Sequence, residues 1–135
     1  SEDIHKDLWS KFARLSVFSG MTAATRSPLG VLRASAGLVK LLETAVDEAL
    51  AVGRALGVAL DDRVRDEVFA MYRGMPPQAK SSMLEDLERG KPLELPWLSG
   101  AVVRLGRENG IPTPTHAVIE ALLTPFVPGG PPAMT

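Results

Sequence analysis

The sequence lacks several residue types and patterns, and each absence excludes a class of protein. It has no cysteine, which excludes disulfides, thiolate metal sites and cysteine nucleophiles. Its 15 basic and 16 acidic residues leave a net charge of −1, which argues against a nucleic-acid-binding surface. No apolar run approaches the roughly 18 residues that span a membrane, and no signal peptide is visible. We therefore expect a cytoplasmic protein.

The glycines and histidines lack the patterns of two common site types. No two of the 12 glycines have the Gly-x-Gly spacing of a dinucleotide-binding turn. The only histidines, His5 and His116, lie far apart in sequence, so neither a histidine metal site nor a catalytic triad is expected. We expect this chain alone to bind no dinucleotide well and to bind no metal.

Helical periodicity covers nearly the whole chain, without the alternation typical of strands. The spacing predicts helices over about residues 3–26, 28–34, 36–56, 61–73, 78–89, 96–109 and 114–126. Asp61 is an expected N-cap, and Ser27 is another, followed by Pro28 at the first helical position. The helices are joined by short loops, so we predict a single all-α bundle over residues 1–126. The Pro- and Gly-rich residues 127–135 are expected to be disordered.

Apolar residues recur along the predicted helices at three- and four-residue spacing, which predicts which faces lie inside. The expected inward residues include Leu8, Phe12, Leu15, Phe18 and Met21 of the first helix, Leu41 of the third and Met71 of the fourth, with Trp9 and Trp97 as packing anchors.

Polar residues that could carry chemistry occur in three places. Lys11, Ser19 and Thr22 share one helical ridge with Leu15, at spacings of four, four and three. Ser81 and Ser82 lie in the middle of a predicted helix, and Glu94 lies in a short link between two prolines. From residue type alone, these are a solvated lysine, two surface serines and a loop carboxylate.

The order of these segments carries a more specific signal. Residues 81–94 contain the serine pair and Glu94, and they are followed by residues 100–107, which include Gly100 and Gly106. The segment Gly110-Ile111-Pro112-Thr113-Pro114 comes next, and Trp9-Ser10-Lys11-Phe12 lies near the N-terminus. Over residues 3–126 this arrangement resembles the C-terminal, substrate-binding half of ketopantoate reductases (2-dehydropantoate 2-reductases). The resemblance implies an all-helical fold like the C-terminal domain of 6-phosphogluconate dehydrogenase. It also implies NADP-dependent reduction of a 2-keto acid, in which NADPH is the hydride donor and the cofactor is bound mainly by an N-terminal half that is absent from this sequence.

The resemblance also implies roles for individual residues. Lys11 would contact the keto oxygen of the substrate and act as the acid, and Glu94 would hold that lysine charged and oriented. Ser82 would bind the substrate, with Ser19 and Ser81 as further candidates. A small-molecule 2-keto acid, the nucleotide-binding half of the same parent chain and a second copy in a homodimer are the expected partners, and this fragment alone is expected to be inactive.

The chain departs from the family at three positions where the resemblance leads us to expect asparagine. Leu15 and Ser19 follow the lysine by one and two turns, and Ala79 lies three residues before Ser82. The side chains of Leu15 and Ala79 form no hydrogen bond, so the pocket is expected to be more apolar than one for ketopantoate. Two alternatives therefore stay open: a reductase of a more apolar carbonyl compound, and a helical binding or dimerisation module without catalysis.

Overall fold

The computed structural model describes residues 3–135, and every regular element in that range is helical. The α-helices are α1 (Ile4–Thr25), α2 (Leu29–Arg33), α3 (Ala36–Ala55), α4 (Asp62–Gly74), α5 (Ser82–Glu88), α6 (Ser99–Glu108) and α7 (Pro114–Leu123). Two 3₁₀ turns, η1 (Leu95–Trp97) and η2 (Thr124–Phe126), precede α6 and follow α7. The predicted all-α fold is confirmed. No helix within residues 3–135 combines the length and apolar character needed to cross a membrane.

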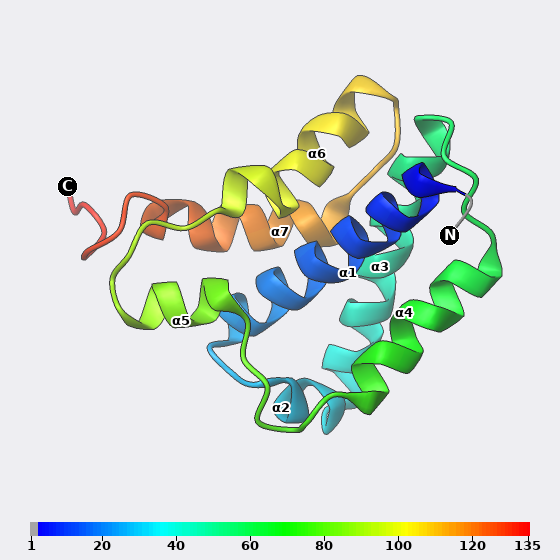
Figure 1. Ribbon diagram of the computed structural model, residues 1–135. Helices are drawn as coiled ribbons and strands as arrows, with labels where there is room; N and C mark the ends of the chain where they lie inside the picture. The colour runs from blue at the N-terminus through cyan, green and yellow to red at the C-terminus, as the bar shows by residue number, and fades with distance from the viewer. Residues whose placement is uncertain (1–2) are drawn as a thin grey trace.

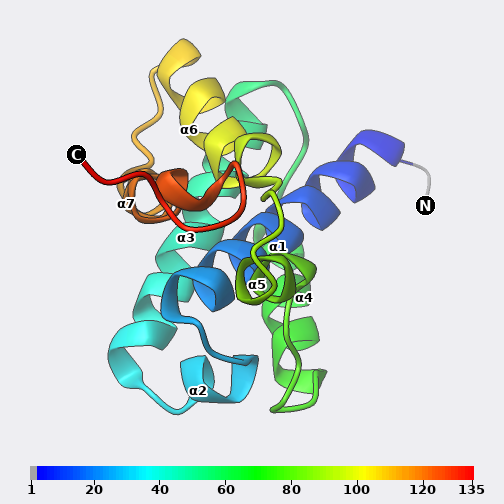
Figure 2. The ribbon, with the colours of Figure 1, turned by 90° about the vertical axis from the view of Figure 1, so that its left-hand side faces the viewer.

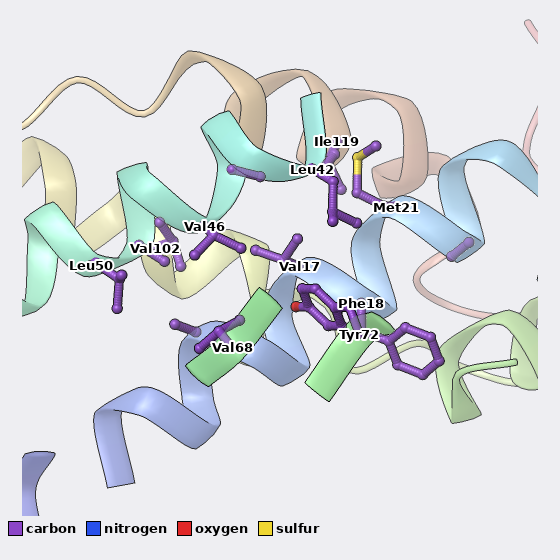
Figure 3. Close-up of a cluster of buried hydrophobic side chains, with 14 of the residues drawn as sticks. Val17, Phe18, Met21, Leu42, Val46, Leu50, Val68, Tyr72, Val102 and Ile119 are labelled. Atoms are coloured by element: carbon purple, nitrogen blue, oxygen red, sulfur yellow. The ribbon is translucent and has the colours of Figure 1, made fainter. Parts of the chain in front are cut away.

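Helix α1 is the central element of the bundle. It packs against each of α2 to α7, and the two ribbon views show it crossing the molecule with α6 and α7 on one side and α5 beside its C-terminal half (Figures 1 and 2). The core forms where α1, α3, α4, α6 and α7 meet (Figure 3). Its side chains include Val17 and Met21 of α1, Leu42, Val46 and Leu50 of α3, Val68 and Tyr72 of α4, Val102 of α6 and Ile119 of α7.

Four helices begin where the N-cap side chain accepts a backbone hydrogen bond; they are α1, α3, α4 and α5, of which α5 is described with the site below. Asp3 accepts from Lys6 N, Ser35 accepts from Leu38 N, and Asp61 accepts from the backbone N–H groups of the first turn of α4. The predicted Asp61 cap is confirmed. The predicted Ser27 cap is wrong, because Ser27 Oγ donates back to Thr25 O at 2.9 Å and α2 begins at Leu29 with Pro28 as its cap.

Several large apolar side chains predicted to lie inside are outside. Leu8, Leu41, Met71 and Trp97 are 59%, 46%, 49% and 70% exposed, and Leu15 is 36% exposed. Leu8 and Leu15 of α1 lie outside because the inner face of this helix contains small residues, among them Ala13, Ser16 and Gly20. A Cβ at Gly20 would lie 2.9 Å from Ile119 Cγ2, so α1 and α7 approach more closely than large side chains would allow. Trp9 does anchor packing, since its Nε1 donates to Ala49 O at 2.8 Å.

The last segment of the chain runs back along the link between α5 and η1. Leu93 N donates to Val127 O at 2.9 Å, and Gly130 N donates to Gly90 O at 2.8 Å. These bonds place the first residues of the segment 127–135 next to the link that carries Glu94. Disorder of that segment stays a prediction.

Candidate active site

The ridge of α1 that carries Lys11 passes from solvent into the protein interior. Lys11 is exposed, Leu15 is 36% exposed, Ser19 is 6% exposed and Thr22 is fully buried. Burial increases along the ridge because the C-terminal half of α1 is covered by neighbouring helices, including α5 and α7. The ridge therefore presents a cation at its open end and hydroxyl groups at its covered end.

The hydroxyl group of Ser19 differs from its neighbours on α1. Ser16, Thr22 and Thr25 each donate to the carbonyl four residues earlier, at 2.6, 2.6 and 2.7 Å. Ser19 Oγ forms no hydrogen bond with any group in residues 3–135, although the residue is only 6% exposed. No buried side-chain nitrogen or oxygen atom in the described residues lacks a hydrogen-bond partner, so the unbonded Ser19 hydroxyl is one that solvent reaches. This hydroxyl is therefore free to bind a ligand.

The serine pair lies at the start of α5, and not in its middle as the sequence predicted. Ser81 is the N-cap, only 3% exposed, and its Oγ accepts from Leu84 N at 3.0 Å. Ser82 is the first helical residue and is exposed. The predicted helix over 78–89 is therefore about four residues too long, because Pro76, Pro77 and the Ser81 cap hold the preceding residues outside it.

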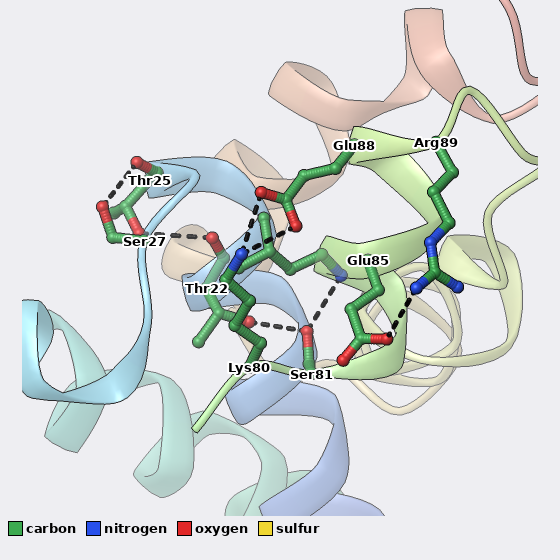
Figure 4. A network of polar contacts seen from close by, with 9 residues as sticks. Thr22, Thr25, Ser27, Lys80, Ser81, Glu85, Glu88 and Arg89 are labelled. Carbon is green, nitrogen blue, oxygen red and sulfur yellow. Dashed lines mark hydrogen bonds and ion pairs between the residues drawn. The ribbon is translucent and has the colours of Figure 1, made fainter. Parts of the chain in front are cut away.

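The two serines differ in what their hydroxyl groups can bind. Ser81 Oγ lies 2.7 Å from Thr22 Oγ1, in addition to its cap bond, so it is engaged within the fold (Figure 4). The Ser82 hydroxyl has no hydrogen-bond partner among residues 3–135. Ser82 can therefore reach a ligand directly, whereas Ser81 acts through the placement of α5.

Glu94 lies in the link between α5 and η1. Its carbonyl accepts from Trp97 N at 3.0 Å and so opens the 3₁₀ turn, while its side chain is exposed. Within the described range 3–135, neither Glu94 nor Lys11 takes part in an ion pair. Both charges are consequently available to a third group, and the predicted pairing of the carboxylate with the ammonium stays a prediction.

A buried polar cluster that the sequence did not indicate lies where α3, α6 and α7 meet. Glu48 of α3 is 7% exposed and accepts from Thr115 N at 2.9 Å and His116 N at 3.1 Å, so it caps the N-terminus of α7. His116 is fully buried between Ser99 Oγ at 3.1 Å and Ala45 O at 2.8 Å. Burial lowers the pKa of His116, and the contacts with Ala45 O and Glu48 oppose that shift. The cluster joins three helices, and no spacing in the sequence connects its members.

An apolar groove of about 340 Å³ lies between α1, α3 and α7. Its walls include Leu41, Val118 and Leu122, which are 46%, 57% and 56% exposed. The groove contains none of the candidate site residues of α5 or of the Glu94 link. It is the kind of surface that a binding or dimerisation module would need.

Comparison with known proteins decides the family. The family described as "Ketopantoate reductase PanE/ApbA C terminal" matches residues 3–126. The chain belongs to this family. It is 35% identical over 122 residues to the 2-dehydropantoate 2-reductase of Caulobacter vibrioides, an alignment that covers 90% of this chain and 41% of that protein. The chain thus spans about two fifths of the length of this relative.

Solved structures show the same fold. The PanE/ApbA family ketopantoate reductase of Ralstonia eutropha JMP134 superposes with a TM-score of 0.84 and 33% identity, over 93% of this chain and 42% of that one. The ketopantoate reductase of Staphylococcus aureus, described as dimeric, superposes with a TM-score of 0.86 and 22% identity, over 93% of this chain and 44% of that one. The C-terminal domain fold implied by the resemblance is confirmed.

Proposed function

We propose that this chain is the substrate-binding and catalytic half of an NADP-dependent reductase that converts a 2-keto acid to the 2-hydroxy acid. The observation that carries the proposal is the α1 ridge, where an exposed Lys11 without an ion-pair partner in residues 3–135 precedes the unbonded hydroxyl of Ser19. Membership of the ketopantoate reductase family supports it. By analogy with the family, we propose that the reductase works in the cytoplasm.

The residues of this chain would divide the work as follows. NADPH supplies the hydride when bound. Lys11 stabilises the negative charge that develops on the keto oxygen and donates the proton to it. Ser82 and Ser19 donate hydrogen bonds to the substrate, and Glu94 keeps the ammonium of Lys11 charged and oriented. Ser81 acts by holding α5.

The nucleotide itself would be held outside this chain. Residues 3–135 contain no strand, so they offer no strand-to-helix turn of the type that cradles a dinucleotide pyrophosphate. That turn would come from the nucleotide-binding half of the parent chain, with the substrate in the cleft between the halves. The 135-residue chain alone would then turn over no substrate.

Leu15 and Ala79 favour a substrate more apolar than ketopantoate. Leu15 stands on the ridge between Lys11 and Ser19 and exposes 36% of its surface, so it offers a substrate apolar contact and no hydrogen bond. A 2-keto acid with an apolar side chain would bury that surface. Ketopantoate carries a hydroxyl group that Leu15 cannot bind.

A second candidate function is a binding or dimerisation module without catalysis. The specific observation in its favour is the apolar groove with exposed Leu41, Val118 and Leu122. The same groove is compatible with a homodimer of the reductase, which we propose as its assembly. The two candidates differ in whether the parent protein oxidises NADPH in the presence of 2-keto acids.

The test is steady-state kinetics of the intact parent protein with NADPH, ketopantoate and a panel of bulkier 2-keto acids. Lys11→Ala should lower kcat by at least about 100-fold, the usual range for loss of a general acid. Lys40→Ala, which removes an exposed lysine from α3, is the matched control and should leave kcat unchanged. Equal activity of Lys11→Ala and wild type would refute the catalytic role. Absence of turnover with every substrate would favour the binding module.

A further inference from the structure

A pair of buried hydroxyl groups joins α1 to α5. Thr22 Oγ1 and Ser81 Oγ lie 2.7 Å apart although 59 residues separate them in sequence, and the residues are 0% and 3% exposed (Figure 4). No other side-chain hydrogen bond joins α1 to the N-terminal turn of α5 within the described residues. The buried residues of α5 itself, Met83 and Leu84, are apolar, and α5 packs against α1.

One assignment of the two hydroxyl protons satisfies every contact of this pair. Thr22 Oγ1 has one proton and donates it to Phe18 O at 2.6 Å, so it can only accept from Ser81. Ser81 Oγ accepts from Leu84 N at 3.0 Å and must then donate to Thr22. The result is a relay from Leu84 N through Ser81 and Thr22 to Phe18 O, in which each hydroxyl donates one bond and accepts one.

The segment before α5 is held separately by α2. Leu29 N donates to Ala79 O at 3.0 Å and Gly30 N donates to Pro77 O at 2.7 Å. A Cβ at Gly30 would lie 2.8 Å from Pro77 O, so the two backbones fit only because position 30 is glycine. Ser82 thus follows a segment fixed to α2 and a cap fixed to α1.

We propose that Thr22 is a positioning residue for substrate binding, an inference that rests on the proposed function. Thr22 lies on the same α1 ridge as Lys11 and Ser19, and it is fully buried, so its role is to position other residues. Its hydroxyl fixes Ser81, and Ser81 fixes the adjacent Ser82 relative to α1, the helix that carries Ser19. Apolar packing has no directional preference, so the polar pair sets the rotation and register of α5 on α1.

The test compares Thr22→Val with two matched variants in the intact reductase. Valine has the shape of threonine but leaves the buried Ser81 proton without an acceptor. We expect KM for the preferred 2-keto acid to rise about tenfold, equivalent to about 1.4 kcal/mol, with kcat within about twofold of wild type. Thr22→Ser restores the hydroxyl and should restore KM. Thr25→Val removes a hydroxyl with the same bond to the carbonyl four residues earlier but without a contact to α5, and should change neither constant.

A second readout and a second variant protect the test against misfolding. Amide hydrogen exchange of Leu84 should be about tenfold faster in Thr22→Val and unchanged in Thr25→Val. Ser81→Ala breaks the pair from the other side and should raise KM similarly, and it replaces Thr22→Val if that variant does not fold.

The outcomes separate this inference from the proposed function. An unchanged KM in Thr22→Val, or an equal rise in Thr25→Val, overturns the positioning role while the reductase activity stands. A wild-type parent protein that reduces no 2-keto acid overturns the proposed function and this inference with it. A KM rise that Thr22→Ser reverses, with kcat retained, supports the positioning role, because a general loss of stability would not show that pattern.

Discussion

Replacing Glu48 by glutamine should destabilise the fold more than any other single carboxylate-to-amide change on α3. The Glu48 carboxylate is 7% exposed, and its two oxygens accept separate bonds from Thr115 N at 2.9 Å and His116 N at 3.1 Å. Glutamine has the same shape but only one acceptor oxygen. Its NH₂ group would face a backbone N–H, which leaves two donors opposed inside the protein.

The magnitude follows from these two bonds. A hydrogen bond to a charged group contributes about 1.5–3 kcal/mol, and the variant loses one such bond. The other bond becomes neutral and weaker, and the negative charge at the N-terminus of α7, worth about 0.3–2 kcal/mol, disappears. Relief of the carboxylate's desolvation offsets part of this loss. We expect the free energy of unfolding to fall by about 2–3 kcal/mol.

Urea denaturation with linear extrapolation measures this difference. Asp47→Asn is the matched control, because the neighbouring carboxylate is exposed and pairs with Arg65 at 2.6 Å on the surface. Loss of such an exposed pair should cost no more than about 1 kcal/mol. If Glu48→Gln and Asp47→Asn lowered the free energy of unfolding equally, the argument that Glu48 caps α7 from the interior would be refuted.

Three further predictions concern packing, pH and specificity. Gly53→Ala would place a Cβ 2.3 Å from Trp9 Nε1 and should lower the free energy of unfolding by about 1–3 kcal/mol. The control Gly37→Ala adds a Cβ in the same helix that meets nothing within 4 Å, and it should not destabilise the protein. Thermal unfolding of the two variants measures the difference. Because burial lowers the pKa of His116, the unfolded chain binds a proton that the native state does not. Stability should therefore fall as pH drops below the unfolded value of 6.5, and His116→Gln should flatten the dependence of the unfolding free energy on pH in that window; an equal slope in both proteins would contradict it. In the proposed reductase, Leu15→Asn should raise kcat/KM for ketopantoate relative to a bulky apolar 2-keto acid by about tenfold or more, and an unchanged ratio would show that Leu15 does not contact the substrate.

The sequence predicted the helices well where local chemistry decides their ends. The Asp61 carboxylate accepts from Arg63 N and Val64 N in the first turn that it caps, and Gly57, with φ +90°, follows the end of α3. The prediction failed where a distant contact decides. Residues 77–79 stay outside α5 although the pattern continued the helix backward, because Pro77 O and Ala79 O accept from the backbone of Gly30 and Leu29 in α2. On the predicted inner face of α1, Phe18 and Met21 are buried as predicted, whereas Leu8 and Leu15 are exposed. Close helix contact selects small inner residues such as Gly20, which carry no apolar signal.

The candidate site likewise contains residues that the sequence indicates and contacts that only the folded structure reveals. Lys11, Ser82 and Glu94 came from the resemblance to a family, since their residue types alone indicate solvated side chains. The structure adds what no motif contains: the Ser19 hydroxyl without a partner in residues 3–135, and the pairing of Thr22 with Ser81. Both features depend on which side chains of different helices come within hydrogen-bond distance of one another. Spacing along one helix reveals a shared ridge, but it does not reveal which hydroxyl on that ridge is left unbonded.

The geometry of a single helix explains why Leu15 is decisive for the proposed substrate. Lys11 and Ser19 are eight residues apart on α1, which is about 12 Å along the helix axis at 1.5 Å per residue. A cation and a hydroxyl that contact one small acid from these two positions leave the middle of the substrate facing Leu15. An apolar residue there offers no hydrogen bond, so it discriminates among substrates only by the apolar surface that each one buries. One methylene more or less in the substrate changes kcat/KM only about 10- to 200-fold. The proposed reductase should therefore accept a series of apolar 2-keto acids with graded efficiency, whereas polar residues at this place would select one hydroxylated substrate sharply.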